Sequence, residues 1–304
     1  AKGIEQFHKN SCDAIIVVGG GSAIDVAKCI KLFSNMDSTK TYLNQEIILN
    51  DITFLAIPTT AGTGSEATRY AVNYYKAVKQ SITNESCIPK TVLFDPSALK
   101  TLPLYQRKST MMDAFCHAIE SFWSVNSTEA SKEYSKKAIE LILGNMDNYL
   151  ANTSDGNAKM LAAANIAGKA INIAQTTAGH AMCYKITSLF GFAHGHAAML
   201  CNQTLFPWML ENIDKCIDPR GKEYLKDVFA QMATTMGCGS AESASKKLNA
   251  LCNSLELEVP IATNEQFEVL KDSVNPIRLK NHPISLDMDT IESLYHKILN
   301  GEAK

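Results

Sequence analysis

One carboxylate and three imidazoles have the residue types and spacing of a divalent metal site. Asp113 and His117 lie in the segment Ser109–Ser121, whose pattern predicts a helix, so a spacing of four residues puts both side chains on one face. His180 and His194 lie in the part of the chain where histidines are densest. Such a set suits a divalent transition metal and leaves room for a substrate oxygen. The alternative for any single histidine is an ordinary core or surface position.

His196 is a second candidate for the fourth ligand, because it lies two residues after His194. We favour His194 and expect His196 to orient one of the ligands through a hydrogen bond. The other histidines, His8, His282 and His296, occupy ordinary contexts and are expected to be structural or exposed.

A second group of residues predicts an anion-binding turn. The segment Val17–Lys28 has the form of a strand, a glycine turn and a helix start. Gly20, Gly21 and Ser22 allow close approach to the backbone, and the N-terminus of the following helix favours an anion. A plain strand–helix turn is the alternative, since the Gly-x-Gly-x-x-Gly fingerprint is absent. The loop Thr59–Glu66 adds hydroxyls and amides at the end of another predicted strand, which favours a nucleotide site.

The elements that must position these residues divide the chain in two. Short apolar runs predict buried parallel strands at 13–18, 53–58 and 91–95, and residues 23–33 have helical periodicity. After Leu102-Pro103 the pattern changes to long helices, such as 131–150 and 158–174. We therefore predict an α/β nucleotide-binding domain over residues 1–102 and an all-helical metal-binding domain over residues 103–304.

The composition excludes several classes of protein. The chain has 304 residues, 46% of them hydrophobic and 20% charged, and a net charge of −2. This charge gives no reason to expect nucleic acid or a membrane surface as a partner, and no apolar run is long enough to cross a bilayer. The nine cysteines are scattered singly, which is typical of reduced thiols in a cytoplasmic protein.

Four motifs, in order along nearly the whole chain, resemble the iron-containing (group III) alcohol dehydrogenase family. They are Val18–Lys28, Pro58–Glu66, Asp113–Ser121 and the segment from His180 to Gly195. The resemblance implies a dehydroquinate synthase-like architecture, with a Rossmann-like α/β domain, a helical domain and the active site between them. It implies Fe²⁺ or Zn²⁺ bound by Asp113, His117, His180 and His194. It also implies contacts to NAD or NADP from Gly20, Gly21, Ser22, Asp25, Thr59, Thr60, Ser65 and Lys79.

The glycine turn follows only one predicted strand, whereas a doubly wound nucleotide domain usually opens with a strand–helix–strand unit for the adenosine end of the cofactor. Family members have several dozen residues before this point. The α/β domain is therefore expected to be incomplete at its start, and these 304 residues to bind NAD(P) weakly or not at all. The choice between NAD and NADP depends on that segment and does not follow from this sequence.

Two positions depart from the family pattern. Met111 replaces a glycine common before the ligand aspartate, and Tyr184 replaces a histidine that many members use for proton transfer. A tyrosine has an ordinary pKa near 10 rather than about 6.5. Its role is either proton donation or packing. Together with Glu120–Glu129, Gly168–Ile173 and Val274–Asn281, Tyr184 is similar to the phosphonoacetaldehyde reductase subgroup.

The expected activity is metal-dependent reduction of an aldehyde by NAD(P)H, with phosphonoacetaldehyde, reduced to 2-hydroxyethylphosphonate, as the substrate to test. An anionic substrate needs fixed cations near the metal. The candidates are Arg69, Lys185, Arg278 and Lys280. The alternatives are a non-redox enzyme that binds NAD and a metal, like dehydroquinate synthase, and an inactive fragment. The expected partners are a small aldehyde or alcohol and, as the assembly to test, a second copy of the chain.

Overall fold

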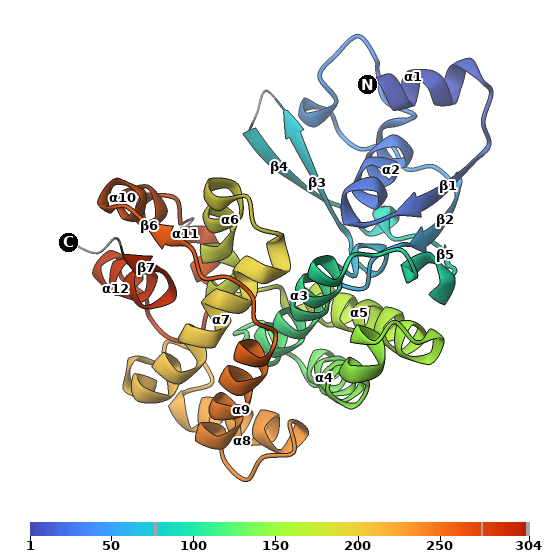
Figure 1. The fold of residues 1–304 in the computed structure, drawn as a ribbon. Helices are drawn as coiled ribbons and strands as arrows, with labels where there is room; N and C mark the ends of the chain where they lie inside the picture. The colour runs from blue at the N-terminus through green and yellow to red at the C-terminus, as the bar shows by residue number, and fades with distance from the viewer. Residues whose placement is uncertain (76–77, 275, 302–304) are drawn as a thin grey trace.

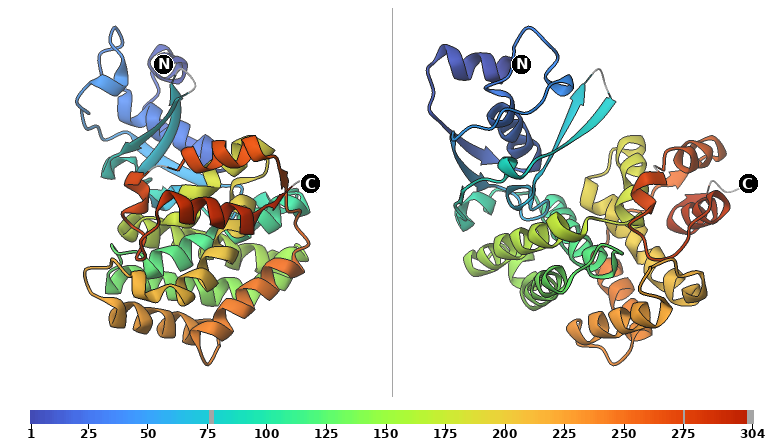
Figure 2. Two further views of the ribbon diagram at one scale, coloured as in Figure 1. Left: turned by 90° about the vertical axis from the view of Figure 1, so that its left-hand side faces the viewer. Right: turned by 180° about the vertical axis from the view of Figure 1, so that it is seen from behind.

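An α/β part and a larger helical part make up the computed structural model, which describes residues 1–75, 78–274 and 276–301 (Figure 1). Both views of Figure 2 show the α/β part at one end of the molecule, with the bundle of helices below it. The α/β part contains α1 (Lys2–Lys9), β1 (Ala14–Gly19), α2 (Gly21–Phe33), β2 (Thr53–Pro58), β3 (Tyr70–Tyr75), β4 (Val78–Thr83) and β5 (Thr91–Val92).

Parallel pairing of β1 with β2 places the two predicted cofactor segments side by side. The sheet order is β1-β2-β5, and Gly19 at the end of β1 aligns with Pro58 at the end of β2. Thr59 N then donates to Gly19 O at 3.0 Å. The glycine turn (Gly20–Ser22) and the loop Thr59–Glu66, called the threonine loop below, therefore leave the same edge of the sheet, where α/β folds bind ligands.

The prediction of a buried first strand is only partly right. Strand β1 is the edge of the sheet, and Ile16 and Val18 are 66% and 63% exposed, whereas Val17 is buried. Ile16 and Val18 alternate with Val17, so they share the face of the sheet opposite to the one on which Val17 is buried. Within the described residues, no strand pairs with the outer edge of β1. The sequence pattern also missed the antiparallel hairpin of β3 and β4 and the first helix, α1.

The helical part is built around α3 (Leu104–Trp123), which is buried almost all round. It contacts α4 (Glu129–Leu150), α5 (Ser154–Ala174) and α7 (His194–Glu211). The capping residues Thr128 and Thr153 accept hydrogen bonds from the first turns of α4 and α5, which explains where these helices begin. The remaining helices are α6 (Ala178–Phe190), α8 (Lys222–Thr235), α9 (Ala241–Ser254), α10 (Asn264–Asp272), α11 (Pro276–Leu279) and α12 (Met288–Ile298).

Two short strands interrupt the predicted all-helical part. β6 (Ile261–Ala262) and β7 (Asn300–Gly301) pair in parallel beside α10 and α12 (Figure 1). No described helix is both long and apolar enough to span a bilayer.

Candidate metal centre

Helices α3 and α6 bring three of the four predicted ligands together. Asp113, His117 and His180 are buried, and one ligand atom from each lies within 4.8 Å of the others. Asp113 Oδ1 is 3.9 Å from His117 Nε2 and 3.4 Å from His180 Nε2. The rings of His117 and His180 stack, with centroids 4.5 Å apart and planes 18° apart. The spacing of four residues therefore puts Asp113 and His117 on the same side of α3, as the sequence predicted.

The donor atoms of this cluster fit a metal ion. Asp113 Oδ1 and His180 Nε2, which face each other across 3.4 Å, are buried and have no hydrogen-bond partner within residues 1–75, 78–274 and 276–301, and neither has His117 Nδ1, the ring nitrogen other than the one measured to Asp113. A buried polar atom without a partner is costly, and a bound ion is a common explanation for one. Carboxylate oxygen and imidazole nitrogen are ligands of both Zn²⁺ and Fe²⁺.

Glu120, which sequence reasoning did not assign, holds His180 in place. It is fully buried, and its Oε1 accepts from His180 Nδ1 at 2.6 Å and from Asn202 Nδ2 at 2.7 Å. Its Oε2 accepts from the backbone amides of Thr177 (2.6 Å) and His180 (3.3 Å), and so caps the N-terminus of α6. With Nδ1 acting as a donor, His180 presents the lone pair of Nε2 to the cluster.

The charges of these buried groups shift one another's pKa. Burial alone would raise the pKa of Glu120, but the charge of His180 and the hydrogen bonds to Glu120 lower it to about 2. Burial opposes protonation of His180, yet Glu120 and Asp113 raise its pKa to about 9. Burial also acts against ionisation of Asp113, but the neighbouring histidines hold its pKa well below the ordinary range. The pKa of His117 is lowered, chiefly by burial. Two ionised carboxylates next to one protonated imidazole leave the buried cluster with a negative charge, so a cation that binds His180 Nε2 would take the place of its proton.

His194 lies beside the cluster, at the first position of α7, but it is not one of the three grouped residues. Its ring centroid is 5.3 Å from that of His180, and the ring of Tyr184 stacks on it with centroids 5.2 Å apart. The thiol of Cys183 is 3.6 Å from His194 Nδ1. Gly195 allows the start of α7 to pack closely on α3, because a Cβ at this position would stand 2.6 Å from the Cβ of Asp113.

The expectation that His196 orients a metal ligand is wrong. Its Nε2 donates to Glu258 O at 2.9 Å, and its Nδ1 lies 3.2 Å from the hydroxyl of Tyr105. Two residues in a helix point about 200° apart, so His194 and His196 face different neighbours. His196 anchors the start of α7 to α3 instead, since its backbone N–H donates to Ser109 Oγ at 3.0 Å.

The predicted cofactor residues gather at the end of the sheet. A Cβ on Gly21 would lie 2.9 Å from Thr63 Oγ1, and one on Gly20 would lie 3.2 Å from Thr60 Oγ1, so the glycine turn rests against the threonine loop. Gly20 caps α2 without a side-chain hydrogen bond, which leaves the first amides of the helix available to an anion.

Asp25 and Ser65, both predicted to contact the cofactor, bind each other. Ser65 Oγ donates to Asp25 Oδ1 at 2.6 Å, and Val72 N donates to Asp25 Oδ2 at 3.0 Å. The two oxygens of Asp25 thus bind the loop, through Ser65, and strand β3, through Val72. The side chain of Lys79 lies outside the described residues.

The four candidate substrate cations differ in setting. Arg69 forms an ion pair with Glu85 at 2.8 Å. Lys185 is half-buried on α6, one residue after Tyr184, whereas Lys280 is exposed. The side chain of Arg278 lies outside the described residues.

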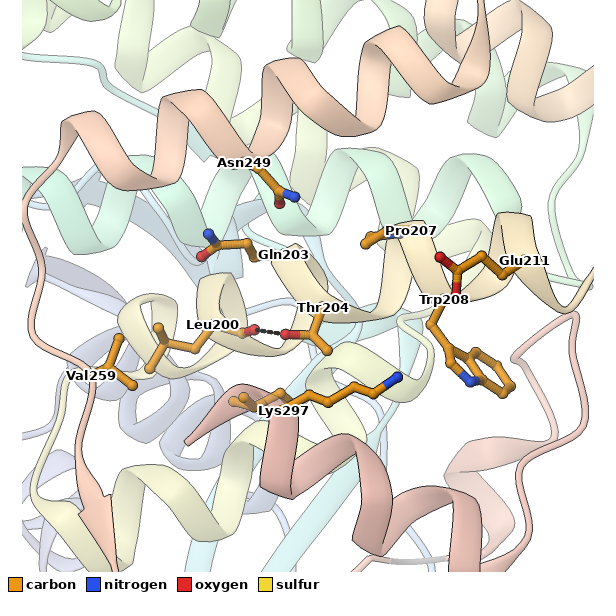
Figure 3. Close-up of a pocket in the computed structure, with 10 residues that line it drawn as sticks. Leu200, Gln203, Thr204, Pro207, Trp208, Glu211, Asn249, Val259 and Lys297 are labelled. Atoms are coloured by element: carbon orange, nitrogen blue, oxygen red, sulfur yellow. Dashed lines mark hydrogen bonds between the residues drawn. The ribbon is translucent and has the colours of Figure 1, made fainter. Parts of the chain in front are cut away.

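Two pockets of the molecule lie away from the cluster of Asp113, His117 and His180. One, of about 380 Å³, is bordered by α7, α9 and α12, with Gln203, Asn249 and Lys297 in its lining (Figure 3). The other, of about 390 Å³, lies beside α1 and α2. Neither is lined by the clustered metal-ligand candidates.

Comparison with known proteins identifies the family. A model of the iron-containing alcohol dehydrogenases matches residues 1–96, and a model of the C-terminal part of the same family matches residues 108–299. Both models describe alcohol dehydrogenases, which argues against the non-redox alternative.

Two curated relatives are similar to almost the whole chain. The phosphonoacetaldehyde reductase of Streptomyces viridochromogenes is 30% identical over 95% of this chain and 77% of its own length. The 4-hydroxybutyrate dehydrogenase of Clostridium kluyveri is 30% identical over 89% of this chain and 74% of its own length.

Solved structures show the same fold. Sulfoacetaldehyde reductase from Bifidobacterium kashiwanohense, in complex with NAD⁺, superposes with a TM-score of 0.85 at 25% identity and covers 97% of this chain and 78% of that one. An iron-containing alcohol dehydrogenase of Thermotoga maritima gives a TM-score of 0.79 at 26% identity, over 98% of this chain and 78% of that one. This chain belongs to the iron-containing alcohol dehydrogenase family and is a metal- and NAD(P)-dependent oxidoreductase of alcohols and aldehydes.

Proposed function

We propose that this enzyme reduces short aldehydes that carry an anionic group, at a divalent ion held by Asp113, His117, His180 and His194. The observation that carries the metal site is the buried group of Asp113, His117 and His180, in which Asp113 Oδ1 and His180 Nε2 have no hydrogen-bond partner among the described residues. The position of His194 beside His180 supports it as the fourth ligand.

The reaction needs an electrophile and a hydride donor. When bound, the metal ion polarises the carbonyl group, and the reduced nicotinamide supplies the hydride. Glu120 keeps His180 in the tautomer that can bind the ion. Tyr184 lies against His194 and is our candidate for the proton donor, in the place of the histidine that many family members have.

The glycine turn and the threonine loop would hold the pyrophosphate of the cofactor. Backbone amides at the start of α2 and the hydroxyls of Thr60 and Thr63 border the same turn. Such amides and hydroxyls are typical phosphate ligands. NAD and NADP are equally compatible with these contacts.

The relatives support an anionic substrate, because phosphonoacetaldehyde, sulfoacetaldehyde and 4-hydroxybutyrate, named in the relatives, all carry a negatively charged group. Of the candidate cations, Lys185 has the best support: it is half-buried, and it follows Tyr184 on the helix that carries His180. Arg69 is less suited, since Glu85 already neutralises it.

The test compares phosphonoacetaldehyde and sulfoacetaldehyde with propionaldehyde, which is uncharged and of similar size. We expect kcat/KM to favour the anionic aldehydes at least roughly a hundredfold, because a half-buried cation that loses its anionic partner penalises the neutral analogue. Lys185→Met should remove most of this preference, and the exposed control Lys280→Met should keep it. Equal efficiency for all three aldehydes would leave a general alcohol dehydrogenase.

We also propose a cytoplasmic location and a homodimer. The location is supported by the nine cysteines, which are scattered singly along the sequence, a pattern typical of reduced thiols. Sedimentation velocity of the purified protein tests the dimer, and a mass equal to one chain would contradict it.

A further inference from the structure

Lys28, in the middle of α2, has a role that the catalytic groups do not explain. It is fully buried, and its ammonium group is enclosed by acceptors from one segment. Nζ donates to the carbonyl oxygens of Ser65 (2.6 Å), Thr68 (2.7 Å) and Tyr70 (2.7 Å). An ammonium has three protons, so these contacts satisfy it. A buried cation is costly without such partners, and its partners here all lie in the segment Ser65–Tyr70, which runs from the end of the threonine loop to the start of β3.

Asp25, one turn earlier on α2, binds Ser65 and the neighbouring strand β3. Its Oδ1 accepts from Ser65 Oγ at 2.6 Å, and its Oδ2 accepts from Val72 N at 3.0 Å. A spacing of three residues puts Asp25 and Lys28 on one face of the helix. Because α2 begins at the glycine turn, this face ties the loop to the helix whose N-terminus would hold the cofactor phosphates.

The opposite side of the loop is fixed to the helical part. Gly64, with a φ of +56°, packs so closely on α5 that a Cβ on it would stand 2.7 Å from Gly168 Cα. Glu66, which is buried, accepts from Asn165 Nδ2 at 3.0 Å. The threonine loop therefore contacts both α2 of the α/β part and α5 of the helical part.

We infer that Lys28 is a positioning residue for the reaction: by holding the segment Ser65–Tyr70 against α2, it fixes the threonine loop so that the cofactor faces the metal centre. The inference rests on the proposed role of this loop in binding the cofactor. If it is right, loss of the ammonium group weakens cofactor binding selectively. If Lys28 only stabilises the core, its loss lowers stability and the active fraction, but the KM for NAD(P)H stays the same.

Lys31 provides a matched control. It lies one turn later on α2, is 4% exposed, and its Nζ approaches Asn50 O at 3.5 Å. Among the hydrogen bonds of the described residues, none joins Lys31 to the threonine loop. Lys28→Met and Lys31→Met therefore remove the same charge from the same buried helix.

Steady-state kinetics of the metal-loaded variants test the inference, with metal content and melting temperature measured alongside. Lys28→Met should raise the KM for NAD(P)H roughly tenfold, the equivalent of one charge-assisted hydrogen bond. Its metal content and its KM for the aldehyde should stay at the wild-type values. Lys31→Met should leave all three unchanged. An equal KM for NAD(P)H in the two variants would overturn the inference.

If Lys28→Met does not fold, Thr68→Val decides. It keeps the side-chain volume and removes only the hydroxyl, which accepts from Lys28 Nζ at 3.2 Å and donates to Ser65 O at 3.2 Å, and so joins Lys28 to the loop. We expect the KM for NAD(P)H to rise about twofold to threefold, and an unchanged KM would overturn the inference. Failure of the proposed function is a separate result, since it would appear in the wild-type protein, either as no preference for anionic aldehydes or as no oxidation of NAD(P)H with any aldehyde.

Discussion

Replacing Glu120 with glutamine should weaken metal binding without unfolding the chain. The carboxylate accepts hydrogen bonds through both oxygens, from His180 Nδ1 and Asn202 on one side and from the amides of Thr177 and His180 on the other. Glutamine keeps the shape but offers one acceptor and one NH₂ donor. Either orientation of the amide therefore breaks part of the network.

The two orientations harm the site in different ways. If the NH₂ group replaces Oε1, it faces His180 Nδ1, and the proton of the imidazole moves to Nε2, the atom that should bind the metal. If it replaces Oε2, the amides of Thr177 and His180 lose their acceptor at the start of α6. Loss of such an orienting partner typically costs tenfold to a hundredfold in metal affinity. This range corresponds to about 1.4–2.7 kcal/mol.

The assay is competition for Fe²⁺ or Zn²⁺ with a chelator of known affinity, with circular dichroism to confirm folding. Glu129→Gln is the control: this carboxylate is exposed on α4 and pairs with Lys132, so its loss should leave metal affinity unchanged. Equal affinity in wild type and Glu120→Gln would refute the role that we assign to the carboxylate.

Four further substitutions probe the same centre. His194→Ala should lower metal content at least tenfold, whereas His196→Ala should retain the ion because its ring is bonded elsewhere; elemental analysis distinguishes them, and the reverse order would make His196 the ligand. Gly195→Ala should displace the start of α7 from Asp113 at a cost of about 1–3 kcal/mol, seen as a lower melting temperature together with lost metal; full metal content would contradict the close approach. Tyr184→Phe should lower turnover roughly a hundredfold if the hydroxyl donates the proton, with unchanged metal content; unchanged turnover across the pH range would assign the tyrosine to packing.

Features encoded by short-range patterns were predicted from the sequence. The glycine turn between β1 and α2 and the pairing of Asp113 with His117 depend on spacing within a single element, and both occur in the structure. Residues 131–150 and 158–174 were predicted as helices and lie within α4 and α5.

The contacts that sequence reasoning missed join distant segments. Glu120 orients His180 from 60 residues away, and Asp25 binds Ser65 from 40 residues away. One signal was available for Glu120, because it lies three residues after His117 and seven after Asp113, on the same face of α3. His194 and His196 contact different neighbours because both lie in the first turn of α7, which begins at His194. That boundary depends on the packing of Gly195 against α3, which no local pattern in the sequence indicates.

Removal and return of the metal tests the central claim most directly. Metal-free wild-type protein should oxidise no NAD(P)H with an aldehyde, and addition of Fe²⁺ or Zn²⁺ should restore both one bound ion per chain and activity. Asp113→Ala and His117→Ala should remain inactive and bind no ion at the same metal concentration, because each loses one of the three clustered ligands. Undiminished turnover in the metal-free protein, or one ion per chain in Asp113→Ala, would contradict the account.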